Sequence, residues 1–286
     1  MPIEVKNLKH IYSAGTPFEK VALSDISFRV EDGEFVGLIG HTGSGKSTLI
    51  QHLNGLLKAD SGEIYVDGQN ICDKSANMKE IRGKVGIVFQ YPEYQLFEET
   101  VYKDIAFGPK NQGLSDAEVD ERVHHVAQLV GLKEKYLEKS PFDLSGGQKR
   151  RVAIAGVLAM KPKVLILDEP AAGLDPVGRD EILRRIKDLH EKEGITVILV
   201  SHSMEDIAMF AQKIIVMSDG ELKMFDTVEN IFARSAELSG MGLAVPQACK
   251  VMQGLREQGL PVNDKIYTVE KATEEILRYL REVGKC

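Results

Sequence analysis

Short runs of apolar residues, many of them β-branched, recur along the chain and are separated by segments with helical spacing. Each run is short enough for a strand that is buried on both faces. The runs occupy residues 3–8, 22–30, 34–39, 85–89, 164–167, 196–200 and 214–217. Strands that alternate with helices along a sequence predict an α/β fold with a mainly parallel sheet.

The helical segments are marked by capping residues and by apolar positions three or four residues apart. Ser115 and Glu118 have the spacing of a capping box, and valines follow them at helical intervals. A second helix carries Ile182 and Ile186 on one face and is predicted to end at Gly194.

The hydrophobic pattern of the sequence changes at two points. Residues 90–160 interrupt the alternation with an almost purely helical stretch, which predicts a subdomain inserted into a main domain of residues 1–225. From residue 226 to 286 the pattern is again helical, with one helix opening at Pro246 and another over about 268–283. A segment of about sixty residues is a poor size for an independent core, so we expect it to pack on the main domain or on a partner.

Composition narrows the class of protein. The 286 residues are 43% hydrophobic and 28% charged, which is typical of a soluble globular protein. The formal net charge of −7 argues against a nucleic-acid-binding surface. Cys72, Cys249 and Cys286 show no C-x-x-C spacing, which favours a reducing compartment without disulfides or a zinc site. We see no signal peptide, and the longest apolar run, residues 152–160, is too short to span a membrane, so a membrane role would require partner proteins.

A glycine-rich segment after the third run fits the pattern G-x-x-x-x-G-K-[ST]. Its glycines let backbone N–H groups point inward at the start of a helix, where the helix dipole favours anions. The lysine is predicted to reach the β- and γ-phosphates of a nucleotide, and the final serine to ligate Mg²⁺. The alternative is a glycine-rich turn with a chance lysine, but a strand precedes the segment and a helical pattern follows it. The predicted nucleotide site comprises Gly40, His41, Thr42, Gly43, Ser44, Gly45, Lys46, Ser47 and Thr48.

Two acids end the buried run 164–167. Asp168 would lie near the phosphate-binding segment, where it could hold Mg²⁺. Glu169 would point to the opposite side of the pleat and could act as general base on the attacking water. Two acids after a strand are often only a solvated turn, but beside a phosphate-binding loop a catalytic pair is the better interpretation.

The sequence Leu144-Ser145-Gly146-Gly147-Gln148 carries the clearest resemblance to a known family. It matches the signature motif of ABC ATPases, and the resemblance covers roughly residues 1–225. It implies a P-loop NTPase fold of the ABC ATPase type, with an antiparallel β subdomain, an inserted helical subdomain and a small C-terminal helical appendage. It also implies ATP and Mg²⁺ as ligands, and a dimer in which the signature motif of one subunit contacts the ATP of the other.

The residues support the same interpretation. Ser145 and Gln148 have capping-box spacing, and the two glycines leave the first N–H groups of a helix uncovered. Lys149, Arg150 and Arg151 then oppose the helix dipole unless an anion lies nearby. By resemblance this anion is the γ-phosphate of ATP held by the other subunit; the alternative is an ordinary capped helix with solvated cations.

Further roles follow by resemblance to ABC ATPases. Gln90 matches the glutamine that touches Mg²⁺ or the attacking water, and His202 matches the histidine that contacts the γ-phosphate and orients that water. Asp175 matches the loop that couples the two sites of the dimer. Tyr12 matches the aromatic residue that stacks on adenine.

The chain also resembles the ATPases of energy-coupling factor (ECF) importers over nearly its whole length. The resemblance is carried by residues 91–101, 107–111 and 242–247. It implies a vitamin or metal-ion importer at the cytoplasmic face of the cell membrane. There a transmembrane coupling protein engages substrate-binding membrane subunits. The FEETVYKD segment resembles the second of two paralogous ATPases, which implies a heterodimer. The amphipathic spacing of the C-terminal helices predicts that they hold the ATPases together when nucleotide is absent; the alternative is that they pack within the chain.

A cluster of apolar and acidic residues follows Gln90, and we expect it to line a groove for a helix of the transmembrane partner. Its members are Tyr91, Pro92, Glu93, Tyr94, Leu96 and Phe97. Glu93 is expected to pair with an arginine of that helix; alternatively these side chains fill the core of the helical subdomain. The competing functions are a soluble ABC ATPase acting on nucleic acid or ribosomes and a nucleotide sensor without catalysis. The net charge disfavours the first, and Glu169 with His202 disfavours the second.

Overall fold

A central sheet forms the middle layer of the protein. The computed structural model describes residues 3–284. The strand order of this sheet is β10-β9-β3-β8-β7-β6. In that order the strands span Glu221–Thr227, Lys213–Ser218, Phe35–Gly40, Thr196–Val200, Val164–Asp168 and Val85–Val88. All neighbouring pairs are parallel except β10 with β9. The predicted α/β fold with a mainly parallel sheet is confirmed.

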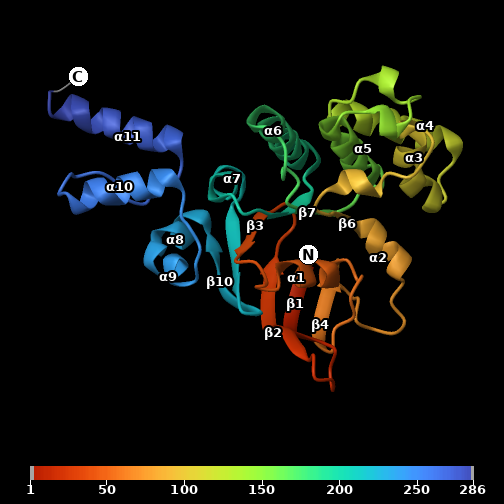
Figure 1. Ribbon diagram of the computed structural model, residues 1–286, viewed down its shortest axis with the longest axis horizontal. Coiled ribbons are helices and arrows are strands. Elements are labelled where there is room, and N and C mark those ends of the chain that lie inside the picture. The colour runs from red at the N-terminus through yellow and green to blue at the C-terminus, as the bar shows by residue number, and fades with distance from the viewer. Residues whose placement is uncertain (1–2, 285–286) are drawn as a thin grey trace.

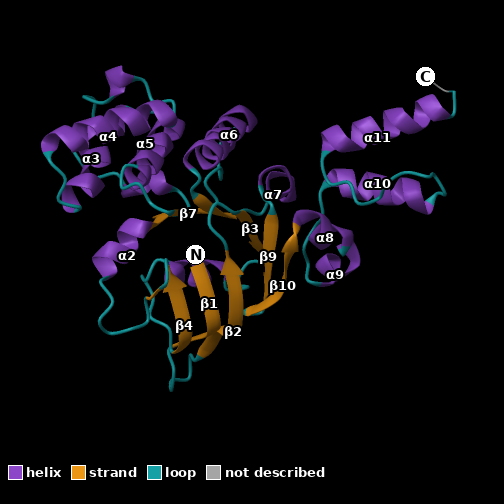
Figure 2. Cartoon of the chain, turned by 180° about the vertical axis from the view of Figure 1, so that it is seen from behind, coloured by secondary structure: helices purple, strands orange, loops and turns teal. Residues whose placement is uncertain are grey.

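A second, antiparallel sheet lies against one face of the first. Its strand order is β2-β1-β4-β5, with bounds Lys20–Val30, Ile3–Tyr12, Ser61–Val66 and Gln69–Asn70. Figure 2 shows β4, β1 and β2 side by side below the central sheet. Helix α1 (Lys46–Leu53) shares a hydrophobic cluster with both sheets, so it lies between them.

Alternation of side chains along the central strands divides the core into two clusters. In β7, Val164 and Ile166 join the cluster around α1, whereas Leu165 and Leu167 face the helices on the other side. The second face is covered by α6 (Pro176–Glu193) and α7 (Met204–Phe210). Because both faces are covered, the strands read as continuous apolar runs.

The inserted helical subdomain is confirmed. It contains α3 (Val101–Asn111), α4 (Asp116–Leu129) and α5 (Gly146–Leu158), with short 3₁₀ turns at η1 (Pro92–Gln95), η2 (Glu134–Tyr136) and η3 (Pro141–Asp143). The expected capping box between Ser115 and Glu118 begins α4. Helix α2 (Met78–Lys84) precedes β6, and Figure 1 shows the subdomain above it, at one end of the molecule.

The C-terminal helices are α8 (Val228–Ala233), α9 (Ser235–Gly240), α10 (Gln247–Glu257) and α11 (Val269–Glu282). In Figure 1, α8 and α9 lie close to β10, whereas α10 and α11 extend away from the subdomain. Ile231 and Leu238 belong to the main core, and a separate small cluster centred on Met252 joins α10 to α11. Helices α8 and α9 therefore complete the main core, although they lie beyond the boundary expected after residue 225.

Within residues 3–284, no helix combines the length and the apolar character needed to cross a bilayer. Cys72 is an exposed free thiol and Cys249 a buried one. Burial raises the pKa of Cys249 to about 11. Cys286 lies outside the described residues.

Candidate nucleotide site

The loops that follow β3, β6, β7 and β8 bring the predicted site residues to one edge of the central sheet. They enclose a cavity of about 470 Å³. The cavity is lined by Tyr12, Lys20, Ala22, Thr42, Gly43, Gly45, Lys46, Ser47, Thr48, Gln90, Asp168, Glu169 and His202. Carboxyl ends of parallel strands are the usual place for a ligand in an open α/β sheet. Lys20 and Ala22, on β2, were not anticipated because no sequence motif marks them.

The phosphate-binding loop depends on its glycines. Gly43 and Gly45 have φ of 83° and 101°, the left-handed region that glycine adopts without strain. A Cβ on Gly45 would lie 2.7 Å from the carbonyl oxygen of Ala22. Gly45 is also the N-cap of α1 and makes no side-chain capping bond. The first amides of α1 therefore remain available to an anion.

Lys46 is held inside this loop. Its Nζ donates to the carbonyl oxygens of Gly40 at 2.7 Å and of His41 at 3.0 Å. Burial lowers the pKa of Lys46, while the charges of Glu169 and Asp168 oppose that shift. The ammonium is thus a partly desolvated cation that would gain from a phosphate beside it.

Asp168 and Glu169 lie in the same cavity. The expectation that strand alternation would turn Glu169 to the opposite side does not hold. Glu169 follows the last residue of β7 with a left-handed φ of 51°, and it lines the cavity together with Asp168. Burial, and then the charge of Glu169, raise the pKa of Asp168, while Lys46 and His202 oppose the shift. A cation near Asp168 would relieve this strain on its ionised form.

The residues fit a magnesium ion that is shared with the substrate. Within residues 3–284, no group of three or more His, Cys, Asp or Glu side chains is arranged to hold a metal by itself. The Ser47 hydroxyl, the Asp168 carboxylate and the Gln90 amide nevertheless line one cavity. Protein Mg²⁺ sites commonly use one or two carboxylates, with water and substrate phosphates completing the coordination. This donor set therefore fits.

Glu169 lies at the centre of a polar group that contains all three predicted catalytic residues. Its Oε1 lies 2.7 Å from His202 Nε2, and its Oε2 accepts a hydrogen bond from Gln90 Nε2 at 3.3 Å. The three side chains come from segments that follow β6, β7 and β8. A carboxylate oriented by a histidine and an amide has the geometry of a base held in place for a water molecule.

Tyr12 ends β1 at the rim of the cavity. Its ring is 40% exposed, and its hydroxyl lies 3.3 Å from Thr48 Oγ1 on α1. The ring of His10 packs edge-on against it, with centroids 4.7 Å apart. The tyrosine therefore has a fixed position beside the phosphate-binding helix and still presents ring surface.

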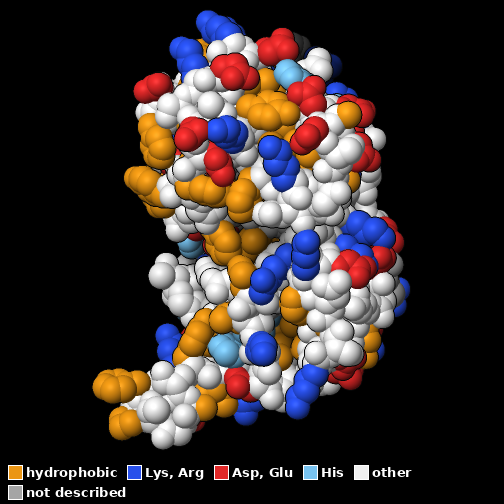
Figure 3. Space-filling model, turned by 90° about the vertical axis from the view of Figure 1, so that its right-hand side faces the viewer, with side chains coloured by type: hydrophobic (Ala, Val, Ile, Leu, Met, Phe, Trp, Pro, Cys, Tyr) orange, Lys and Arg blue, Asp and Glu red, His pale blue; other side chains and the backbone are white. Residues whose placement is uncertain are grey.

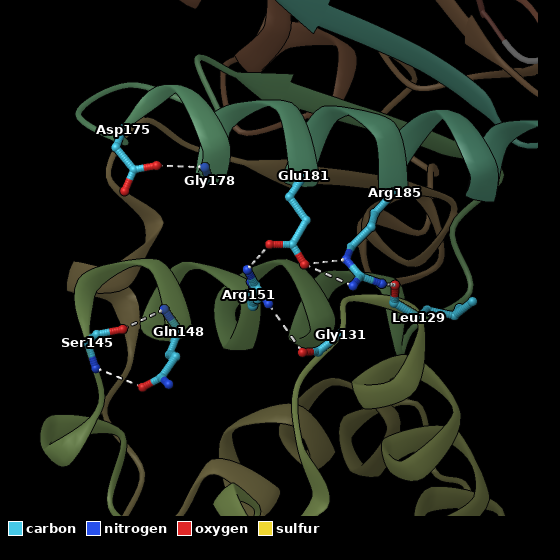
Figure 4. A network of polar contacts seen from close by, with 9 residues as sticks. All are labelled: Leu129, Gly131, Ser145, Gln148, Arg151, Asp175, Gly178, Glu181 and Arg185. Atoms are coloured by element: carbon cyan, nitrogen blue, oxygen red, sulfur yellow. Dashed lines mark hydrogen bonds and ion pairs between the residues drawn. The ribbon is translucent and has the colours of Figure 1, made fainter.

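The signature residues lie outside this cavity. Ser145 is the N-cap of α5, and its Oγ accepts from the Gln148 amide at 3.4 Å while Gln148 Oε1 accepts from the Ser145 amide at 3.0 Å. Figure 4 shows this predicted capping box at the free end of α5. Ser145 and Gly146 are exposed, a Cβ on Gly146 would meet nothing within 4 Å, and Leu144 is buried beneath them.

Asp175 caps the neighbouring helix in the same region. Its Oδ1 accepts from the Gly178 amide at 2.7 Å, which fixes the start of α6. Figure 4 shows this cap beside the signature residues, because α5 and α6 run next to each other. The loop from Glu169 to Asp175 thus connects the cavity to the exposed signature surface.

The cations at the start of α5 do not await an external anion, contrary to the expectation from the sequence. Arg150 pairs with Glu93, with Nη2 and Oε1 2.8 Å apart. Arg151 Nη2 lies 2.6 Å from Glu181 Oε2, as Figure 4 shows. Lys149 Nζ lies 5.8 Å from the centroid of the Phe142 ring. The two arginines thus have carboxylate partners within the chain.

A groove of about 520 Å³ lies between the helical subdomain and the central sheet. Leu96 and Phe97 line it, together with Phe107 of α3, which packs edge-on against Phe97 at 5.0 Å between centroids. Figure 3 shows hydrophobic side chains gathered in the band between the subdomain and the rest of the molecule. Asp104 of α3 is also in the groove, and no sequence motif marks it.

The other four residues expected in this groove do not line it. Pro92 is buried, and Glu93 is occupied by Arg150, so an arginine of a partner helix is not needed to neutralise it. Tyr91 and Tyr94 are 42% and 85% exposed, outside the groove lining. The burial of Pro92 agrees with the alternative of core filling, and Leu96 belongs both to the core and to the groove wall.

Comparison with known proteins agrees with this geometry. A family model described as ABC transporter matches residues 23–172. The solved structure of cbiO1 from Clostridium perfringens, described as part of the ABC transporter complex cbiONQ, superposes with a TM-score of 0.73 at 38% identity, over 83% of this chain and 93% of that one. The ATP-binding cassette MJ0796, solved as a dimer with ADP and Pi, gives 0.71 at 31% identity, over 79% and 98%. Fold and site define an ABC-type ATPase.

Curated relatives narrow the family further. A protein of Caldanaerobacter subterraneus subsp. tengcongensis is 58% identical over 281 residues, covering 98% of both chains. A protein of Clostridioides difficile is 58% identical over 288 residues, covering 100% of both. Each is named energy-coupling factor transporter ATP-binding protein EcfA2. The chain belongs to this family of ECF transporter ATPases, which confirms the resemblance predicted from residues 91–101, 107–111 and 242–247.

Proposed function

We propose that this chain binds ATP with Mg²⁺ in its cavity and hydrolyses it when a second ATPase subunit closes over the γ-phosphate. One observation carries the proposal. The cavity holds the phosphate-binding loop and the Glu169, His202 and Gln90 group together, while Ser145 and Gly146 of the signature motif are exposed outside it. Because the cavity contains the phosphate-binding loop but no signature residue of the same chain, a second chain is needed to supply the signature contact.

The side chains divide the chemistry between them. Lys46 would neutralise the β- and γ-phosphates, and Ser47, Asp168 and Gln90 would hold Mg²⁺, which would supply further charge neutralisation. Glu169 accepts a proton from the attacking water, and His202 keeps the carboxylate in place. General-base catalysis of this type contributes about 10²–10⁴-fold to the rate. Tyr12 stacks on the adenine.

The second chain contributes its signature helix. Ser145 and Gly147 of one subunit approach the γ-phosphate in the cavity of the other, where exposed amides at a helix N-terminus favour anions. Asp175 links the two sites, because its loop joins Glu169 to α6 beside the signature. We take the partner to be a paralogous ATPase, and the α10–α11 pair to hold the two chains together without nucleotide.

The groove lined by Leu96, Phe97 and Phe107 receives a helix of a transmembrane coupling protein. An apolar groove beside the Gln90 segment would let nucleotide-driven movement act on that helix. The solved relative cbiO1, described as part of an ABC transporter complex, supports this assembly. The chain then lies at the cytoplasmic face of the membrane, and separate membrane subunits select a vitamin or a metal ion.

The test replaces Glu169 by Gln in the full transporter complex reconstituted in vesicles. Phosphate release and ATP-driven uptake should both fall at least about 100-fold, since the base is lost. ATP binding should persist, because Lys46 and the loop amides are unchanged. Glu205→Gln, which neutralises an exposed carboxylate at the start of α7, is the matched control. Normal turnover in Glu169→Gln would refute the role of Glu169.

A further inference from the structure

Arg150 is a buried cation that contacts two separate segments of the chain. It lies in the second turn of α5 and is only 2% exposed. Its Nε and Nη2 donate to the two carboxylate oxygens of Glu93, at 3.1 and 2.8 Å. Its Nη1 donates to the carbonyl oxygens of Pro170 and Ala172, at 3.2 and 2.5 Å. One planar group therefore fixes four acceptors at once.

The acceptors belong to the two segments that matter for catalysis and docking. Glu93 lies in η1, between Gln90 and the groove residues Leu96 and Phe97. Pro170 and Ala172 lie in the loop that begins with Glu169. The guanidinium thus bridges a segment at the wall of the groove and the segment that carries the base.

Arg150 and Glu93 form a bidentate ion pair with little exposure to water. The side chains of Arg150 and Glu93 are 3% and 15% exposed, so water competes little for their hydrogen bonds. Burial acts to raise the pKa of Glu93, but the hydrogen bonds and charge of Arg150 outweigh it and the pKa is lowered. Bidentate arginine–carboxylate contacts fix orientation as well as distance. A displacement of η1 is therefore transmitted through Arg150 rather than absorbed by solvent.

We propose that Arg150 is a positioning residue: it holds the Glu169 loop in register with η1, so that docking in the groove sets the position of the base. This rests on the proposed function, in which Glu169 is the base and a partner helix occupies the groove. The route is separate from the direct contact between Gln90 and Glu169, because it reaches Glu169 through the main chain of the following loop.

The test measures hydrolysis in the full transporter complex, with kcat expressed per site that binds nucleotide. Arg150→Met should lower this kcat by about 10- to 100-fold, as a misplacement of the order of 1 Å does, while KM for ATP changes less than about twofold. Arg150→Lys should recover part of the rate, because it restores a charge next to Glu93. Arg151→Met is the matched control: it lies on the same helix and pairs with Glu181 instead, so its kcat should stay within about twofold.

Two double variants separate positioning from general stability. If Arg150 acts through Glu169, then Arg150→Met should lower the residual rate of Glu169→Gln by no more than about twofold. Glu93→Gln should lower kcat in the native background but not in Arg150→Met. The proposal would be overturned by an unchanged kcat per site in Arg150→Met or by an equal loss in Arg151→Met. It would also be overturned if the effects of Arg150→Met and Glu169→Gln on kcat simply multiplied in the double variant. Failure of the proposed function is recognised separately, by normal turnover in Glu169→Gln.

Discussion

Truncation at two points should distinguish the part of the C-terminal region that belongs to the main core from the part that is an appendage. Removing residues 226–286 deletes Val228, Ile231, Phe232 and Leu238, each at most 2% exposed. At about 1.5–3 kcal/mol for each buried side chain, the loss is about 6–12 kcal/mol. This is comparable to the whole stability of a typical domain, about 5–15 kcal/mol. We expect the chain 1–225 to be insoluble or unfolded.

Removing residues 246–286 instead deletes α10 and α11 with their own small cluster around Met252. From the main core it takes the buried Cys249 and the partly buried Tyr267, which packs against Phe232. The chain 1–245 should therefore stay folded, with a single urea transition and native circular dichroism. Equal stability of the two truncated chains would refute this assignment of the core. With the proposed paralogous partner present, light scattering without nucleotide should show that 1–245 no longer associates; persistent association would contradict the proposed dimerisation through the tail.

Three further predictions concern single side chains. Burial and the charge of Glu169 raise the folded-state pKa of Asp168, so its ionised form destabilises the fold at neutral pH. Asp168→Asn should therefore raise the Tm of the nucleotide-free chain by a few degrees. The same variant should lose the additional stabilisation that Mg²⁺ gives with ATP, and thermal denaturation measures both effects. Tyr12→Ala should raise KM for ATP by about 5- to 150-fold with a smaller change in kcat, since base stacking contributes about 1–3 kcal/mol. The pKa of Glu93 is lower in the folded chain than in the unfolded chain, so its ionised carboxylate stabilises the fold above the unfolded pKa of about 4.3. This stabilisation is lost as the pH falls through the folded pKa. The Tm difference between the native chain and Glu93→Gln should therefore close on acidification from about pH 6 to pH 3; a constant difference would contradict the ion pair.

The sequence predicted five strands of the central sheet, β3, β6, β7, β8 and β9, and two strands of the antiparallel sheet, β1 and β2. β8 has the bounds expected from its continuous apolar run. The strands that were missed, β4, β5 and β10, have one exposed face or are very short, and so carry charged residues such as Glu63 and Lys223. A half-exposed strand gives a weaker signal than a buried one, because only every second residue is apolar.

Local motifs predicted most of the cavity, because the phosphate-binding loop and the paired acids are contiguous in sequence. The direction of Glu169 was not predictable, since it depends on a left-handed φ that strand alternation does not include. Nor was the pairing of Arg150 with Glu93, which are 57 positions apart. From the helix dipole alone, Arg150 is expected to be a surface charge. In the folded chain it is instead buried and paired with the carboxylate of Glu93.

Buried charges of opposite sign also restrict how a sequence can diverge. Replacing either Glu93 or Arg150 alone by a neutral residue would leave the other charge buried and unpaired, whereas replacing both would leave two neutral side chains in contact. Among natural descendants of this gene, positions 93 and 150 should therefore change together. Arg234 and Glu237, whose side chains are 46% and 54% exposed, should drift independently.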